Sequence, residues 1–314
     1  MSIAQRLADS ALINPGSDRV RSVAGLARRS ARSRAGRFLA EGPQCVREAL
    51  RAHLGEFDAL VPAPRDGVID ALYITERALQ RHPDIDQLVK RVLQAEGSPR
   101  VFVRMVSDEV LAAMSDAEHP QGVLAVCRIP ELTWAQVAER RPRLAAVMCR
   151  VQDPGNAGTV LRAADAAGAD AVVLTAGSVD LHNPKVVRST AGSLFHLPVL
   201  TGLDPAELVG RPVSDAAGGE LQVLAADGYG ALDLDELQDA SAAGREAAVE
   251  LARPTAWLFG NEAQGLSEQE KALASHRVAV PLHGAAESLN VGTAATLCLY
   301  ASARAQRRTA EGAA

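Results

Sequence analysis

Aromatic side chains, paired cysteines and long apolar runs are all scarce in this sequence. Phe, Trp and Tyr together make up 3% of the 314 residues, so the chain has little material for platforms that stack single-stranded bases. Any contact with nucleic acid is therefore expected to depend mainly on charge. The four cysteines are far apart and never form a CxxC pair, which argues against a zinc or iron–sulfur site and against a disulfide framework.

Signals for a membrane or for secretion are missing as well. No stretch approaches the ~18 uninterrupted apolar residues of a membrane-spanning helix. Residues 1–13 carry Arg6 and Asp9 and lack the apolar segment of a signal peptide. Together with the unpaired cysteines, this predicts a reducing, cytoplasmic setting. The seven histidines show no metal-ligand spacing, so no metal is expected.

Charge is unevenly distributed along the chain. The formal net charge is −5, yet seven arginines and no acid lie between residues 19 and 37, whereas eleven acids and two arginines lie between 204 and 250. Clusters of charge of one sign indicate which kind of partner a surface attracts or repels. We expect the basic run to face phosphate and the acidic stretch to lie on a face turned away from it.

Two α/β patterns follow one another along the chain. Before residue 128, apolar runs alternate between strand and helix periods, which predicts a small α/β domain. The segment 129–142, with two prolines and a charged cluster, is typical of a linker. Beyond it, apolar strands followed by helices predict a parallel sheet covered by helices. The expected division is an arm 1–18, a domain 19–128, the linker 129–142, a larger domain 143–308 and a tail 309–314.

The first motif, Asp153-Pro154-Gly155-Asn156-Ala157-Gly158, directly follows the predicted strand 144–149. A tight turn and a helix start at this point leave free N–H groups that can meet an anion, with Arg162 about one turn inside the helix. The spacing is neither GxGxxG nor GK[ST], so neither dinucleotide nor P-loop chemistry is supported. An ordinary turn between strand and helix, with a solvated arginine, would give the same local sequence.

Two further motifs end later strands. The strand 255–259 runs into Gly260-Asn261-Glu262, and a glycine at the carboxyl end of a strand lets a ligand approach the backbone. Glu262 could equally be an ordinary acid in a first helical turn. The third motif runs from Val280-Pro281 to Ser288-Leu289-Asn290-Val291 and opens a long helix. Ser288 and Asn290 are also good N-cap residues, so capping alone would explain them.

Taken in order, these motifs resemble the signatures of the SpoU/TrmH family of the SPOUT superfamily, RNA ribose 2′-O-methyltransferases that use S-adenosylmethionine. The resemblance rests on Asn156-x-Gly158-x-x-x-Arg162, Leu258-Phe259-Gly260-Asn261-Glu262-x-x-Gly265-Leu266 and Val280-Pro281…Ser288-Leu289-Asn290-Val291. The segments 183–198, 38–42 and 120–123 also resemble the family. The resemblance implies a parallel-sheet domain with a deep trefoil knot, and an N-terminal α/β domain with a fold like that of ribosomal protein L30e.

By this motif match, the resemblance implies five catalytic residues: Arg162, Asn156, Glu262, Ser288 and Asn290. Arg162 matches the family arginine proposed to activate the 2′-hydroxyl. A guanidinium with a pKa above ~12 is a poor base, so orienting the hydroxyl and its neighbouring phosphate is an equally good role. Asn156 and Glu262 would position Arg162 or its loop, while Ser288 and Asn290 would line the pocket. The cofactor is expected on the backbone of Gly260, Val280 and Leu289, with Leu258 and Leu282 as walls.

The resemblance also implies a homodimer with RNA lying across both subunits. The helix 289–306 is compatible with a dimer interface, although core packing predicts the same pattern. The basic residues expected to contact RNA are Arg28, Arg29, Arg32, Arg34, Arg37, Lys185 and Arg188, and the last two could equally be solvated surface charges. Ribosomal RNA is favoured over transfer RNA because of the first domain. The alternatives are a transfer-RNA methyltransferase and an RNA-binding protein of the same fold that lost catalysis.

Overall fold

The computed structural model describes residues 11–57, 67–95, 99–209 and 220–312. The first ten residues of the expected arm, residues 210–219 of the acidic stretch and the last two residues of the expected tail lie outside this description. The chain divides into two units. Unit 1 comprises Met1–Glu131 and Asp180–His196, and unit 2 comprises Leu132–Val179 and Leu197–Ala314. The sequence pattern predicts one continuous domain over 143–308, whereas in the structure Asp180–His196 belongs to unit 1.

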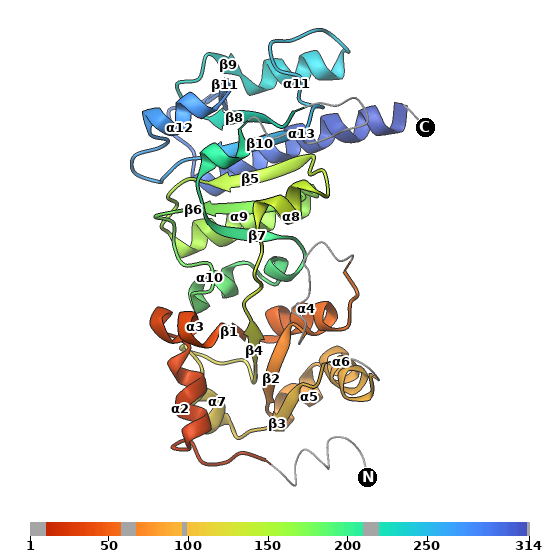
Figure 1. The fold of residues 1–314 in the computed structure, drawn as a ribbon, viewed down its shortest axis with the longest axis vertical. Helices are drawn as coiled ribbons and strands as arrows, with labels where there is room; N and C mark the ends of the chain where they lie inside the picture. Colours follow the sequence, from red (N-terminus) through yellow and green to blue (C-terminus); the bar gives the residue numbers. More distant parts are fainter. Residues whose placement is uncertain (1–10, 58–66, 96–98, 210–219, 313–314) are drawn as a thin grey trace. The chain divides into compact units, whose positions relative to one another are not determined.

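Unit 1 is built around a mixed sheet in which the described strands follow the order β1-β4-β2-β3 (Figure 1). β4 pairs antiparallel with both of its neighbours, and β2 pairs parallel with β3. These strands are β1 (Arg37–Glu41), β2 (Ile69–Ile74), β3 (Phe102–Met105) and β4 (Val123–Arg128).

Helices cover both faces of this sheet, because successive side chains of a strand point to opposite faces and β1, β2 and β4 are buried at nearly every position. α2 and α7 supply Val20, Val110 and Met114 to a cluster that also contains Leu39 of β1 and Tyr73 of β2. α4 packs against β1, β2 and β4 from the other face and against α6. The helices of unit 1 are α2 (Asp18–Gly25), α3 (Arg29–Ala35), α4 (Pro43–His53), α5 (Glu76–Arg81), α6 (Pro83–Gln94), α7 (Asp108–Met114), α10 (Pro184–Ser189) and η1 (Ser193–Phe195).

Unit 2 contains a parallel sheet in the order β7-β6-β5-β10-β8-β11-β9 over the described residues. Its central strands are buried throughout, as parallel strands covered on both faces must be. The strands are β5 (Leu144–Met148), β6 (Ala171–Thr175), β7 (Val199–Leu203), β8 (Gln222–Ala226), β9 (Leu232–Asp233), β10 (Thr255–Phe259) and β11 (His276–Ala279). The predicted α/β class with a parallel sheet is confirmed.

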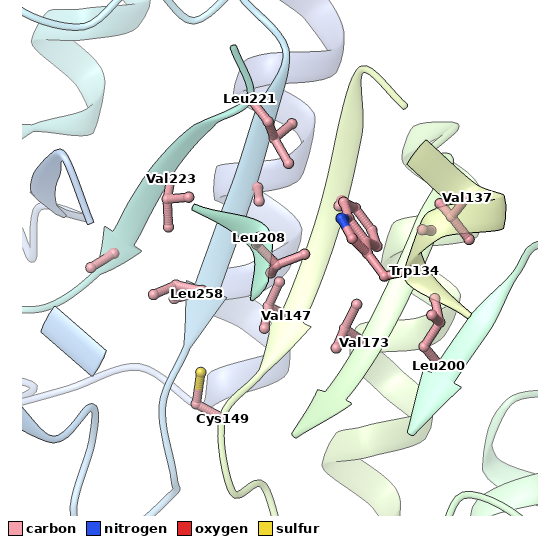
Figure 2. Close-up of a cluster of buried hydrophobic side chains, with 14 of the residues drawn as sticks. Trp134, Val137, Val147, Cys149, Val173, Leu200, Leu208, Leu221, Val223 and Leu258 are labelled. Carbon is pink, nitrogen blue, oxygen red and sulfur yellow. The ribbon is translucent and has the colours of Figure 1, made fainter. Parts of the chain in front are cut away.

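Two layers of helix enclose this sheet. On one face α9 (Pro154–Ala167) and α13 (Val291–Gly312) pack together, and the Trp257 Nε1 donates to Ser302 Oγ at 2.9 Å. On the other face α8 (Trp134–Ala138) and η2 (Pro205–Leu208) cover a cluster that includes Leu258 (Figure 2). The other helices among the described residues of unit 2 are α11 (Leu234–Ala242) and α12 (Glu268–Leu273). Within the part of the chain described, no helix combines the length and the apolar character needed to cross a membrane.

The strand order of unit 2 indicates where a ligand-binding crevice should lie. From β5 the chain moves outward through β6 to β7, while β10 lies on the opposite side of β5 next to β8. Open α/β sheets bind ligands outside the carboxyl ends of their strands at such a reversal. The first two sequence motifs follow β5 and β10 directly, so the fold brings both to this point.

Candidate functional site

A cleft of about 790 Å³ opens at the carboxyl ends of β8, β10 and β11. Residues 226–229 line it after β8, residues 259–266 after β10, and residues 279–282 and 287–291 after β11. Tyr229 stands at this cleft with 90% of its surface exposed. The volume lies within the roughly 300–1,000 Å³ that small-molecule sites occupy.

The loop after β10 turns back so closely that position 260 requires glycine. A Cβ on Gly260 would lie 2.3 Å from the carbonyl carbon of Gly265 and 2.4 Å from the backbone nitrogen of Leu266. Asn261 and Gly265 exchange backbone hydrogen bonds of 3.1 and 2.8 Å, and Gly265 has a φ of +65°. Both partners of the close approach are backbone atoms, so no rotamer change could relieve a larger side chain.

A chain of three polar side chains joins the three motifs at the edge of the cleft. The Asn156 Nδ2 donates to Glu262 Oε1 at 3.1 Å, and the Asn290 Nδ2 donates to Asn156 Oδ1 at 2.8 Å. Glu262 also accepts the backbone N–H groups of Gln152 and Asp153 at 3.2 and 3.1 Å. Residues that are more than one hundred positions apart in sequence therefore fix one another in a single arrangement.

The electrostatics of Glu262 follow from these bonds. Burial opposes its ionisation, but hydrogen bonds from its own N–H, from the Asn156 amide and from the backbone of Gln152 and Asp153 lower its pKa below the ordinary 4.5. Glu262 is thus a carboxylate at neutral pH and acts as an acceptor. Because folding lowers this pKa, the stabilisation is present above the ordinary value and is lost as the pH falls through the lowered one.

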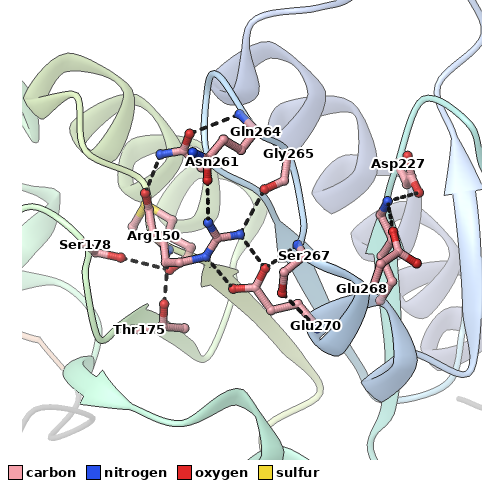
Figure 3. Close-up of polar contacts among 12 residues, drawn as sticks. Arg150, Thr175, Ser178, Asp227, Asn261, Gln264, Gly265, Ser267, Glu268 and Glu270 are labelled. Atoms are coloured by element: carbon pink, nitrogen blue, oxygen red, sulfur yellow. Dashed lines mark hydrogen bonds and ion pairs between the residues drawn. The ribbon is translucent and has the colours of Figure 1, made fainter.

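An arginine that the sequence motifs did not include anchors the loop after β10 (Figure 3). The Arg150 guanidinium donates to both Glu270 oxygens at 2.9 and 2.7 Å and to the Gly265 carbonyl at 3.1 Å. Its own carbonyl accepts the Asn261 amide at 2.8 Å, and its N–H donates to Thr175 Oγ1 at 3.1 Å. Burial opposes ionisation of Glu270, yet the hydrogen bonds from Arg150 and from the backbone and side chain of Ser267 together outweigh it and lower the pKa of that carboxyl.

The structure brings together most of the residues that the sequence motifs singled out. Those that line the cleft are Asn156, Gly260, Glu262, Val280, Leu282, Ser288, Leu289 and Asn290. Leu258, expected as a wall, does not line it: its side chain is fully buried in the cluster on one face of the sheet (Figure 2). Arg162 does not line it either. That side chain is exposed on α9 and has no hydrogen bond or ion pair with any described residue.

The basic residues expected at the RNA separate into two groups within unit 1. Arg28, Arg29, Arg34 and Lys185 are exposed, and their side chains have no ion pair among the described residues. Three others are engaged inside the unit. Arg32 is buried, pairs with Asp180 and donates to the Leu26 and Ala27 carbonyls at 2.9 and 2.7 Å. Arg37 pairs with Asp70 at 2.9 Å, and Arg188 pairs with Glu41 and Asp116.

Fold and site together define an α/β protein whose parallel sheet carries a ligand cleft at the carboxyl ends of its strands. The chain belongs to the SpoU rRNA methylase family, whose model matches residues 143–300. A second model, the MRM3-like substrate binding domain, matches residues 17–125. The resemblance drawn from the sequence motifs is confirmed.

Relatives are found both among characterised proteins and among solved structures. The chain is 32% identical to the 23S rRNA (uridine(2479)-2′-O)-methyltransferase of Streptomyces viridochromogenes, over 64% of this chain and 67% of that protein. It is 36% identical to the 23S rRNA (guanosine(2553)-2′-O)-methyltransferase RlmP of Bacillus subtilis, over 62% and 70% of the two chains. The SpoU methyltransferase AviRb from Streptomyces viridochromogenes, solved with AdoMet, matches with a TM-score of 0.71 at 28% identity, covering 93% of this chain and 99% of that one.

Proposed function

We propose that this protein transfers the methyl group of S-adenosylmethionine to a ribose 2′-hydroxyl of ribosomal RNA. The observation that carries the proposal is the cleft in which the hydrogen-bonded side chains Glu262–Asn156–Asn290 unite three separate motifs. The 23S rRNA 2′-O-methyltransferases among its relatives support ribosomal RNA over transfer RNA.

The residues around the cleft fit S-adenosylmethionine. Val280, Leu282 and Leu289 give it apolar walls, and Gly228 and Gly260 line it with backbone that no side chain of their own covers. An amphipathic ligand with a purine ring suits such a lining of apolar surface and few oriented polar groups. When bound, this cofactor supplies an electrophilic methyl group on a positively charged sulfur.

The polar side chains of the cleft position the ribose whose 2′-oxygen accepts the methyl group. Methyl transfer needs the 2′-oxygen in line with the methyl carbon and the sulfur, so the groups beside the ribose must be fixed. Asn156 is fixed by its bonds to Glu262 and Asn290. The Ser288 hydroxyl lines the cleft with no hydrogen bond to a described residue, so it is available to the substrate.

Arg162 does not line the cleft of its own chain, so it would act at the cleft of a second copy of the chain. α9 and α13 lie side by side, since a Cβ on Gly292 would meet Thr159 Cγ2 at 2.6 Å and the Tyr300 hydroxyl donates to the Ala166 carbonyl at 3.3 Å. Their outer face exposes Arg162 beside large side chains: Leu297 and Tyr300 are 44% and 46% exposed. A homodimer that covers this face would bring the Arg162 of one protomer to the cleft of the other.

The substitution Leu297→Asp tests this dimer. A charge in the covered face is expected to convert the dimer to a monomer in analytical ultracentrifugation and to abolish methyl transfer, while binding of S-adenosylmethionine persists. Leu93→Asp is the matched control, since Leu93 is 43% exposed on α6. A Leu297→Asp protein that sediments like the wild type would exclude this face as the interface.

Two finer features of the fold belong to the same proposal. α13 follows the loop after β11 and packs against α9, β5 and β10, an arrangement that supports threading of the chain into a deep trefoil knot, against the general rule. The small residues Gly292, Ala294 and Ala295 permit the required close approach. For unit 1, we propose a fold like that of ribosomal protein L30e and a role in binding the RNA.

The ion pair of Arg150 with Glu270, which holds the loop after β10, leads to a prediction about binding of the cofactor. Glu270→Gln removes the charge that holds Arg150, and hydrogen bonds to charged groups contribute about 1.5–3 kcal/mol. We expect roughly tenfold weaker binding of S-adenosylmethionine by calorimetry, together with a lower Tm. Glu268→Gln, two residues away on the same helix with a side chain that is 87% exposed, should change neither. Equal effects of the two substitutions would show that the anchor does not act on the cleft.

The exposed basic residues that have no ion pair among the described residues lead to a prediction about RNA binding. Replacing Arg28, Arg29 and Arg34 together with alanine is expected to weaken binding of ribosomal RNA and to reduce the slope of log K against log[salt] by about two to three. Cofactor affinity should not change. The double variant Arg77→Ala/Arg81→Ala, at exposed positions of α5, controls for a general loss of charge. An unchanged salt slope in the triple variant would mean that these side chains are only solvated.

The proposed function is tested by mapping 2′-O-methylated nucleotides on total RNA from cells with and without the gene. We expect one ribosomal site to disappear with the gene. A site lost only from transfer RNA would reassign the substrate. No lost site, together with no thermal stabilisation of the protein by S-adenosylmethionine, would favour an RNA-binding protein that lost catalysis.

A further inference from the structure

Unit 1 contains a cavity of about 220 Å³ that is distinct from the cleft of unit 2. It lies where β1 passes into α4 and where the segment before β4 returns to the sheet. Leu111, Cys45 and Val123 provide apolar surface, while Glu41 and Arg188 lie on its polar side. Burial raises the pKa of Cys45 to about 11, so the thiol is neutral and adds no charge.

The charges beside this cavity are already balanced. Glu41 is buried, accepts the Ser115 hydroxyl at 3.1 Å and the Asp116 N–H at 2.7 Å, and pairs with Arg188. Arg188 also contacts Asp116 Oδ2 at 3.1 Å. One guanidinium held between two carboxylates offers no net positive charge to a phosphate, but a guanidinium has five N–H donors and these pairings leave some of them open. The site therefore suits a neutral polar group better than an anion.

The rim of the cavity carries hydrogen-bonding side chains that face the solvent. Gln44, His119 and Gln121 line it and are exposed, and none of their side chains has a hydrogen bond to another described residue. Gly42, at a φ of +84°, brings the backbone close to the Gln121 amide, since a Cβ there would lie 3.0 Å from Gln121 Oε1. Amides present both a donor and an acceptor, which is the pattern of a nucleobase edge.

We propose that this cavity takes a single unpaired base of the ribosomal RNA substrate. The proposal rests on the proposed function for its RNA and adds a place where sequence can be read. Its volume exceeds the ~150 Å³ cavity that holds one benzene ring and lies below the roughly 300 Å³ at which sites for larger ligands begin, so a base enters while its sugar and phosphate stay outside. Proteins read RNA mainly through unpaired bases, on their hydrogen-bonding edges and by stacking on rings such as the His119 imidazole.

The first test uses AMP, GMP, CMP and UMP as probes against the full-length protein. Each is titrated to millimolar concentration while the side-chain amide signals of Gln44 and Gln121 are followed by NMR. We expect saturable shifts at both, with one base preferred over the other three. Inorganic phosphate at the same concentration should leave these signals unchanged. Absence of any shift with all four nucleotides, or equal shifts with phosphate, would overturn the proposal.

The second test uses RNA purified from ribosomes of a strain that lacks the gene. In the double variant Gln44→Ala/Gln121→Ala, the loss of two hydrogen bonds is expected to raise the KM for this RNA about tenfold and to leave kcat and cofactor affinity unchanged. Gln94→Ala, at an exposed position of α6, is the control. An unchanged KM for the double variant, with methylation at the normal rate, would refute the base site and leave the proposed function intact. Binding of nucleotides by a protein that methylates no RNA would instead refute the proposed function and leave the base site standing.

Discussion

Replacing Gly260 with alanine is expected to destroy the cleft. The added methyl group would lie 2.3–2.8 Å from backbone atoms of Gly265 and Leu266, and these atoms cannot rotate away. Overpacking costs about 1–3 kcal/mol where side chains can adjust, and each 1.4 kcal/mol is a factor of ten in affinity. We therefore expect binding of S-adenosylmethionine to weaken about a hundredfold or more in calorimetry, with methyl transfer lost in parallel.

Gly228 supplies the matched control for this substitution. It lines the same cleft, yet a Cβ there would meet no atom within 4 Å. Gly228→Ala should therefore bind the cofactor much like the wild type. Near-normal cofactor binding by a folded Gly260→Ala protein would contradict the assignment of this cleft as the cofactor site.

Arg162→Ala is expected to slow methyl transfer at least about a hundredfold without affecting the binding of S-adenosylmethionine. Arg162 is exposed on α9 and does not line the cleft of its own chain, so its loss removes no contact from the cofactor site. Help in activating or orienting a reacting hydroxyl is worth about 10²–10⁴ in rate. We expect kcat to fall by roughly a hundredfold or more, while the Kd for S-adenosylmethionine measured by calorimetry stays within error.

Two comparisons make this prediction specific. Arg245→Ala removes an exposed arginine of unit 2 and should leave kcat unchanged. A mixture of the Arg162→Ala and Gly260→Ala proteins should recover part of the activity, because a mixed form of the proposed homodimer would join an intact cleft to an intact Arg162. Near-normal turnover by Arg162→Ala alone would refute the role of this residue.

The central strands of unit 2 could be predicted because they are continuous apolar runs. The expected strands 144–149 and 255–259 correspond to β5 (Leu144–Met148) and β10 (Thr255–Phe259). β7 and α11 were not predicted. β7 contains a threonine and a glycine and is partly exposed, and α11 lies within the acidic stretch. Pairing with β6 stabilises β7, and packing against α13 and β9 stabilises α11, more than the composition of either segment does.

The placement of Leu258 shows where motif matching alone fails. Successive side chains of a strand point to opposite faces, and Leu258 joins the cluster beneath α8 and η2 rather than the cleft. Gly260, two residues further on, lies after the strand has ended and lines the cleft through its backbone. All five residues of β10 are buried, so the sequence of the strand did not show that Leu258 would lie in the core of the sheet rather than in the cleft at its end.

Charge counted along the sequence could not separate free arginines from paired ones. Arg32 belongs to the basic run, but its partner Asp180 lies 148 positions later, and Arg188 pairs with Glu41 147 positions earlier. Arg150 was missed for the same reason, since Glu270 is 120 positions away. Such pairs arise from the tertiary fold, and no local pattern encodes them.

The most direct test of the proposed function is methylation of defined RNA by the purified protein. RNA from ribosomes of a strain without the gene is incubated with the protein and S-adenosylmethionine carrying an isotopically labelled methyl group, and the label is located by mass spectrometry of the digested RNA. We expect the label on one nucleotide, on its ribose 2′-oxygen, with the wild-type protein, and incorporation at least about a hundredfold slower with Arg162→Ala. Label on a base, or label that is equally strong with Arg162→Ala, would contradict the proposed function and mechanism.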